Sequence, residues 1–341
     1  MESGPEIKIL DQAERQFRED AGVVLGQRVD RMASLSRTLL DVTDPDQADA
    51  MWLAARRLRA ALELFRPVLS KPQLAGTRDE VRQISRVVGR RRDIDSMIRT
   101  FEGITAEMDP GGEQGLGLLI EALREDQAES NRNLAQLSNG RRLQALRLRV
   151  EDLTGGQLVG HGPDEVTELR VPEQVPPSVV KIVRRRLSRL RSSVPAALEP
   201  DAVREQQRMR VAAERLRYSL DLTAEALGTQ ASTASRAAAG LQQVLGGMRD
   251  CDIAVPMARE RIREFEATDV RAITERARGT RDLDPVLVQA APNRMLYRGP
   301  QLAIVHLEAS RTILFERFRR LWLEQSRQGV WVALETALDN G

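Results

Sequence analysis

The stretch Ala54-Ala-Arg-Arg-Leu-Arg-Ala-Ala-Leu-Glu-Leu-Phe65 decides the fold, because the chain contains a second copy of it. The second copy reads Ala212-Ala-Glu-Arg-Leu-Arg-Tyr-Ser-Leu-Asp-Leu-Thr223, and the two share their leucines and two of their arginines. An Arg-Asp-x-Asp element follows each copy at nearly the same distance, first at Arg92 and again at Arg249. Two motifs in the same order and at similar spacing indicate an internal duplication.

Each copy has the spacing of an amphipathic helix. In the first copy the apolar residues recur every three or four positions, so that they form one stripe along a helix. Leu58 lies in the middle of this stripe, and Arg56, Arg57 and Arg59 lie along its margins. The pattern therefore predicts a helix that is buried on one side and lined with arginines at its edges.

The rest of the chain is predicted to be helical as well. In the first half we expect helices at about 11–40, 46–66, 73–107 and 113–153, the last with a possible break at Asn139-Gly140. In the second half we expect helices at about 178–194 and 201–227, one that carries Arg249, and one at about 301–328. The connector 156–177 between the halves is rich in glycine and proline. We therefore predict an all-α fold of two tandem four-helix bundles, residues 1–155 and 178–341.

Charge and cysteine content narrow the class of protein. The 341 residues carry 52 basic and 50 acidic side chains, and Lys8, Lys71 and Lys181 are the only lysines. Guanidinium groups suit the paired recognition of phosphate or carboxylate. One cysteine, Cys251, excludes an internal disulfide and fits a reducing compartment. No apolar run approaches the length of a membrane span and the start is unlike a signal peptide, so we expect a cytoplasmic protein without membrane insertion.

The repeated arginine helices, each followed by a glycine and Arg-Asp-x-Asp, resemble the CHAD family, the conserved-histidine α-helical domain. The resemblance covers essentially the whole chain. It implies two four-helix bundles related by a pseudo-twofold axis, a basic surface that binds inorganic polyphosphate, and no catalytic chemistry. The family's signature histidines would fall at Asp49 and Gln207, so this sequence lacks both. Trp52 replaces an arginine of the first motif, and Glu214 replaces a base of the second.

Arginines of the two motif helices are the candidate ligands for a polyanion, because a guanidinium fork makes paired, charge-assisted hydrogen bonds to phosphate oxygens. The stretch 178–194 contains no acidic residue and could extend the same surface. Alternatively, these arginines belong to solvated helix margins, where their stems cover apolar surface and their heads pair with acids. The candidate residues are Arg56, Arg57, Arg59, Arg210, Arg215, Arg217, Lys181 and Arg185.

We find no convincing set of residues for catalysis, metal binding or a cofactor. His161 and His306 lack a partner that would suggest a triad or a bundle metal site. No glycine-rich phosphate loop is present. The acids of Arg-Asp-x-Asp are two residues apart and do not face the same way on a helix. We expect them to hold arginines in place, and Cys251 to be a small buried residue.

The sequence therefore favours a non-catalytic module that binds a polyanion, most naturally inorganic polyphosphate by resemblance. One alternative is a helical scaffold that has lost its ligand and binds protein, since Asp49 and Glu214 would repel a polyanion. Another is nucleic-acid binding through the basic helices. An enzyme is the weakest interpretation.

Overall fold

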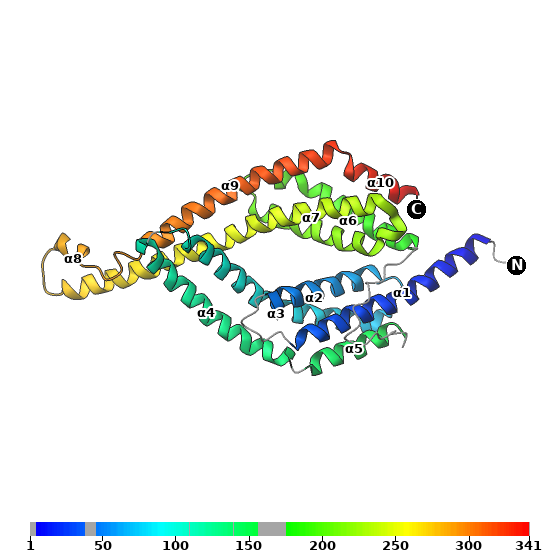
Figure 1. Ribbon diagram of the computed structural model, residues 1–341, viewed down its shortest axis with the longest axis horizontal. Coiled ribbons are helices and arrows are strands. Elements are labelled where there is room, and N and C mark those ends of the chain that lie inside the picture. Colours follow the sequence, from blue (N-terminus) through cyan, green and yellow to red (C-terminus); the bar gives the residue numbers. More distant parts are fainter. Residues whose placement is uncertain (1–4, 38–45, 109, 139, 156–174, 341) are drawn as a thin grey trace. The chain divides into compact units, whose positions relative to one another are not determined.

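The computed structural model describes residues 5–37, 46–108, 110–138, 140–155 and 175–340. Regular structure in these ranges is helical throughout, with no strand, which confirms the all-α prediction (Figure 1). The helices are α1 (Pro5–Ser36), α2 (Asp46–Leu64), α3 (Lys71–Thr105), α4 (Pro110–Ser138), α5 (Arg141–Leu153), α6 (Pro177–Ala197), α7 (Val203–Arg276), α8 (Pro285–Gln289), α9 (Arg298–Arg327) and α10 (Val330–Asn340).

The chain divides into two compact units. The first unit comprises Met1–Arg92, Ser130–Leu245 and Phe318–Gly341, and the second comprises Asp93–Glu129 and Gly246–Arg317. The long helices α3, α4, α7 and α9 each contribute residues to both units. Each of these units contains residues from both halves of the sequence, so the units do not correspond to the two halves. The division into residues 1–155 and 178–341 as two four-helix bundles stays a prediction. Residues 156–174 of the expected connector lie outside the described residues.

The first unit is built around the apolar stripe of the first motif. α1 lies beside α2 and α5, and α6 packs against α10 (Figure 1). Leu58 on α2 and Phe65, the residue that follows α2, are fully buried, and the ring of Phe65 lies 4.7 Å from that of Phe17 on α1, centroid to centroid. Leu216 and Leu220 of the second copy are also fully buried. The helical spacing therefore identified the core positions of both copies.

Glycines end or interrupt helices where the sequence suggested breaks. Gly140 has a φ of 72° and separates α4 from α5, at the predicted break. Gly228 has a φ of 71° inside α7, just after Leu227, where the sequence predicted a helix end. A positive φ strains residues that carry a Cβ, so glycine suits both positions. The C-terminal α10 was not predicted, and neither was α8 within the loop before α9.

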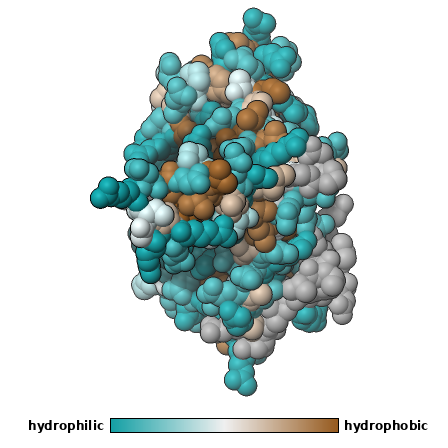
Figure 2. Space-filling view, turned by 90° about the vertical axis from the view of Figure 1, so that its left-hand side faces the viewer, coloured by the Kyte–Doolittle hydropathy of each residue, from teal (hydrophilic) through white to brown (hydrophobic). Residues whose placement is uncertain are grey.

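The second unit has a core of its own. Phe101 and Leu116 are fully buried there, together with Ala254 and Ala303 from the second half of the sequence. Its surface carries several exposed aliphatic side chains, and hydrophobic residues lie among hydrophilic ones on the face that includes α8 (Figure 2). Within the described ranges, no helix has both the length and the apolar composition that a membrane span requires.

Candidate functional site

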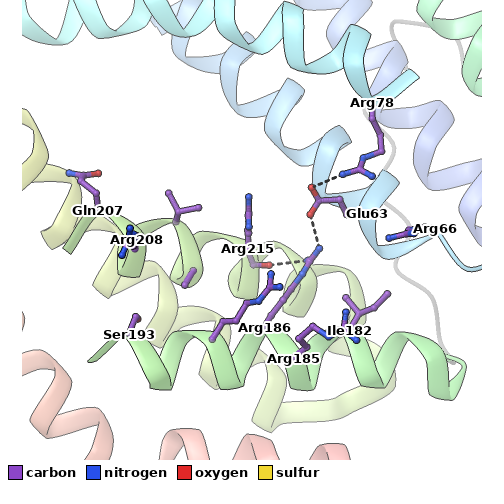
Figure 3. Close-up of a pocket in the computed structure, with 13 residues that line it drawn as sticks. Glu63, Arg66, Arg78, Ile182, Arg185, Arg186, Ser193, Gln207, Arg208 and Arg215 are labelled. Atoms are coloured by element: carbon purple, nitrogen blue, oxygen red, sulfur yellow. Dashed lines mark hydrogen bonds and ion pairs between the residues drawn. The ribbon is translucent and has the colours of Figure 1, made fainter. Parts of the chain in front are cut away.

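A pocket of about 800 Å³ opens in the first unit between the two copies of the motif. α6 and the start of α7 form one wall, and the end of α2, the turn that follows it and α3 form the other (Figure 3). Its volume lies within the range of ligand-binding pockets. Arginines dominate the lining, which contains Arg66, Arg78, Arg185, Arg186, Arg189, Arg208 and Arg215.

Helical periodicity explains why arginines converge here. Ile182, Arg185, Arg189 and Ser193 recur every three or four residues on α6 and line the pocket together. The opposite side of α6 supplies buried apolar residues, Leu187 among them, to the core. On α7, residues 207, 208, 211, 212 and 215 share a face in the same way. Each helix therefore buries one face and turns a polar face to the pocket.

The pocket has a strong excess of positive charge. Among the described residues, Glu63 is the single acid in its lining, against seven arginines. Within the described part of the chain, Arg66, Arg185, Arg189 and Arg215 have no ion-pair partner. Like charges that line one pocket without ion-pair partners repel one another, so an anion that enters would relieve their repulsion.

Glu63 and Arg186 form the fixed centre of the lining. The Arg186 guanidinium donates to Glu63 Oε2 at 3.0 Å and to the Arg215 carbonyl oxygen at 3.1 Å (Figure 3). It also bonds Ser219 Oγ. Burial lowers the pKa of Arg186, and the charges of Arg215 and Arg189 act in the same direction, whereas Glu63 opposes them. Arg78 Nη2 lies 3.8 Å from Glu63 Oε1.

The pocket contains two of the residues that the sequence predicted as polyanion ligands. Arg185 and Arg215 line it, the first exposed on α6 and the second half-buried on α7. Lys181 is exposed on α6 but outside the lining. Arg57 is half-buried on α2, and its charge adds to burial in lowering the pKa of Arg28 to about 10.

The other predicted arginines have acidic neighbours. Arg56 on α2 and Arg210 on α7 both approach Glu214, whose side chain is only 4% exposed; Arg56 forms an ion pair with it, and Arg210 Nη1 lies 3.8 Å from Oε2. Arg59 Nε lies 4.0 Å from Glu63 Oε1. Arg217 donates to Gln242 Oε1 at 3.2 Å and lies 3.8 Å from Asp221. These groups are partly neutralised by the chain itself.

The positions expected to carry the signature histidines have different surroundings. Asp49 accepts a hydrogen bond from Arg92 Nε at 2.7 Å. Next to this pair, the guanidinium groups of Arg56 and Arg92 lie 4.2 and 4.4 Å from the centre of the Trp52 ring, which is cation–π geometry. Gln207 lines the pocket and accepts from Arg210 Nε at 3.0 Å.

Asp93, Asp250 and Asp252 of the Arg-Asp-x-Asp elements pair with arginines, as predicted, and Asp95 accepts a hydrogen bond from Gln127. In the second unit Arg249 donates to both carboxylate oxygens of Asp93, at 3.2 and 3.0 Å, which joins the two elements. Arg311 Nε donates to Asp252 at 2.5 Å. Across the residues that the structure describes, no group of three or more His, Cys, Asp or Glu side chains is placed to hold a metal ion.

The remaining candidates for chemistry have unremarkable environments. Cys251 is buried, and burial together with Asp252 and Asp250 raises the pKa of its thiol to about 11. A thiol with a raised pKa is a poor nucleophile. His306 is exposed on α9, and His161 lies outside the described residues.

Most of the pocket consists of residues outside the set predicted from the sequence. Arg66, Arg78 and Arg208 lie outside the repeated motif, and Glu63 was noted only as part of it. For Arg186 and Arg189, the feature of the sequence that indicated a binding surface was the stretch 178–194, which contains basic residues but no acidic one. Positions spaced by three or four residues share one face of a helix, and this spacing distinguishes the residues that face the pocket from Arg184 and Arg191. Those two arginines pair with Asp339 and Glu335 of α10.

Comparison with known proteins identifies a family and related folds. A family model described as CHAD domain matches residues 23–259. The solved CHAD domain from the plant Ricinus communis is 19% identical, with a TM-score of 0.53 and coverage of 96% of this chain and 91% of that one. PptA from Streptomyces chartreusis is 17% identical, with a TM-score of 0.52 and coverage of 89% and 99%. At these identities the two structures support the fold alone. No curated protein matches the chain.

Proposed function

This chain belongs to the CHAD domain family, which is associated with polyphosphate binding, and we propose that it is a non-catalytic module that binds inorganic polyphosphate in the arginine-lined pocket. The observation that carries the proposal is the charge of this pocket, where the described residues contribute seven arginines and one glutamate. Four of these arginines have no acid partner among the described residues. They supply the paired donors that successive phosphate groups accept.

The repeat supports the same location. Both copies of the motif contribute to the pocket, Glu63 from the first and Arg215 from the second. This arrangement fits an internal duplication into two four-helix halves whose binding surfaces meet. It also fits the loss of the signature histidines, since Gln207, at one histidine position, still lines the pocket and can donate through its amide. Asp49, at the other, is bonded to Arg92.

A titration with inorganic polyphosphate at two salt concentrations tests the proposal, with duplex DNA as competitor. If arginines displace counterions from the ligand, affinity falls steeply with salt, and the slope reports the number of phosphate contacts. The combined variant Arg185→Ala and Arg189→Ala should weaken binding and reduce that slope by roughly one to two. Displacement of polyphosphate by DNA at matched charge concentration would favour a nucleic-acid ligand instead.

A matched control is available on the same helix. Arg184→Ala with Arg191→Ala removes the same charge from α6 but affects arginines that pair with α10 outside the pocket. We expect this control to retain the wild-type salt slope. Equal losses in the two double variants would show that net charge, not the pocket, drives binding.

The arginines of the motif helices form a second set to test. These are Arg56, Arg57, Arg59, Arg210 and Arg217, with Lys181 on α6. The double variant Arg59→Ala with Arg217→Ala measures how much these two arginines contribute to polyphosphate affinity. If it loses more affinity than the Arg185 and Arg189 variant, the ligand binds along the motif helices and not in the pocket.

One observation favours a different function, a helical scaffold that binds protein. Glu214 is the acid partner of Arg56 and Arg210, and Asp49 pairs with Arg92, so acids of the chain compensate part of the motif's charge. A wild-type protein that fails to bind polyphosphate at low salt would support this alternative.

A further inference from the structure

We propose that Glu63 acts as an anion built into the pocket and restricts the site to ligands that carry several linked phosphates. This inference rests on the proposed function, because it concerns selectivity at the same site. Glu63 is the penultimate residue of α2 and points toward α6, so its carboxylate lies among the pocket arginines (Figure 3).

The contacts of Glu63 are those that a phosphate group would make. One carboxylate oxygen accepts from Arg186 at 3.0 Å, and the other lies 3.8 Å from Arg78 and 4.0 Å from Arg59. The Glu63 side chain is 22% exposed and that of Arg186 only 9%, so the pair is largely shielded from water. In such surroundings Arg186 needs a counterion, and Glu63 already supplies it.

An incoming anion therefore meets two opposite effects. Arg66, Arg185, Arg189 and Arg215 attract it, and none of them has an ion-pair partner in the described part of the chain. Glu63 repels it and has already satisfied Arg186. The attraction grows with each phosphate that reaches another guanidinium, whereas the repulsion comes from one fixed charge.

Ligand length then decides which effect is larger. A single phosphate reaches few guanidinium groups and must sit beside Glu63 or displace it. A chain of linked phosphates engages several arginines at once, and its additional contacts raise the affinity without a new association cost. The geometry thus predicts discrimination against short anions, even though arginines dominate the pocket.

Replacement of Glu63 by glutamine tests this selectivity. Glu63→Gln removes the charge and keeps the shape and an oxygen that Arg186 can bond. Tripolyphosphate affinity should rise about tenfold, which corresponds to ~1.4 kcal/mol, as expected for loss of one like charge at a few ångströms. Long-chain polyphosphate should gain about threefold or less, because most of its contacts lie farther from Glu63. The ratio of the affinity for long-chain polyphosphate to that for tripolyphosphate should therefore fall.

Glu80→Gln is the matched control. Glu80 on α3 pairs with Arg142 at 2.5 Å and lies outside the pocket lining, and its side chain is 16% exposed, close to the value for Glu63. The Glu80→Gln substitution removes one negative charge from the first unit, as Glu63→Gln does. We expect it to leave the affinity ratio unchanged. Glu63→Ala provides a second, uncharged replacement, and thermal melting establishes that each variant is folded.

The outcomes separate this inference from the proposed function. If the wild type binds long-chain polyphosphate and neither replacement of Glu63 changes the ratio, the inference is wrong and the function stands. If Glu80→Gln narrows the ratio as much, the effect comes from net charge and the inference is also wrong. If neither the wild type nor any Glu63 variant binds, both proposals are overturned. Binding that appears only after replacement of Glu63 would support the role of the built-in anion.

Discussion

Removal of the Glu214 carboxylate should destabilise the first unit. Glu214 lies on α7 with its side chain 4% exposed, and Arg56 on α2 is 13% exposed. Arg210 is 15% exposed and lies 3.8 Å from the same oxygen. Burial lowers the pKa of Arg56, so its charged form already carries a desolvation penalty that Glu214 offsets. Glu214→Gln leaves two arginines beside a neutral amide.

The expected loss follows from the burial of the group. Breaking a buried ion pair by removal of one partner costs about 3–5 kcal/mol. Both arginines retain some contact with water, and glutamine keeps one acceptor oxygen, so we expect ~2–3 kcal/mol. In a domain of 150–250 residues this corresponds to a fall in Tm of roughly 5–10 °C. Thermal melting followed by circular dichroism measures the fall, and urea denaturation gives the corresponding free energy of unfolding.

Two further variants make the reasoning refutable. Glu335→Gln disrupts the pair of Glu335 with Arg191, in which both side chains are about half exposed, and should cost less than ~1 kcal/mol. The double variant Arg56→Met with Glu214→Leu replaces much of the charge cluster by apolar groups and should recover part of the loss. If Glu214→Gln costs no more than Glu335→Gln, the buried-pair argument fails.

Other predictions concern the second unit. Gly115→Ala places a Cβ against the carbonyl oxygen of Leu296, so thermal melting should show a loss of about 1–3 kcal/mol; Gly117→Ala on the same helix meets open space and should show none. Burial and the hydrogen bond to Asp269 raise the pKa of Tyr297 to about 12. The stabilisation by the neutral phenol is therefore complete below pH 10 and is lost as the pH rises toward 12. Tyr297→Phe should melt at a lower temperature near neutral pH, and its difference from wild type should shrink across that window; a constant difference would contradict the coupling to Asp269.

The sequence predicted the helices well because local spacing carries that information. Leu58 and Leu216 are core positions of the two motif copies, and both are fully buried. Gly140 and Gly228 fall where helices were expected to break. Family membership was likewise readable, because the repeat and the Arg-Asp-x-Asp elements occur in a fixed order. These features depend on residues that are neighbours in the chain.

The charge state of the candidate site depends on neighbours that are distant in the chain, and a single sequence does not reveal them. Arg56 was predicted as a ligand from its own motif, yet its acid partner is Glu214 of the other copy. Arg66 and Arg78 belong to no repeated pattern, and only the tertiary fold, which places the end of α2 and α3 at the same pocket as α6 and α7, brings them there. Composition identifies an arginine-rich surface but not which guanidinium groups the chain has already neutralised.

Pairing, more than arginine content, therefore distinguishes a binding group from a structural one in this protein. α6 provides the sharpest comparison, because Arg184 and Arg185 are adjacent in the chain and identical in chemistry. Arg184 donates to Asp339 and to the Leu338 carbonyl on α10, whereas Arg185 faces the pocket with no acid partner among the described residues. The same contrast separates Arg191 from Arg189. If a ligand responds only to net charge, replacement of Arg184 and Arg191 should weaken its binding as much as replacement of Arg185 and Arg189. If the ligand binds in the pocket, only the second replacement should weaken it.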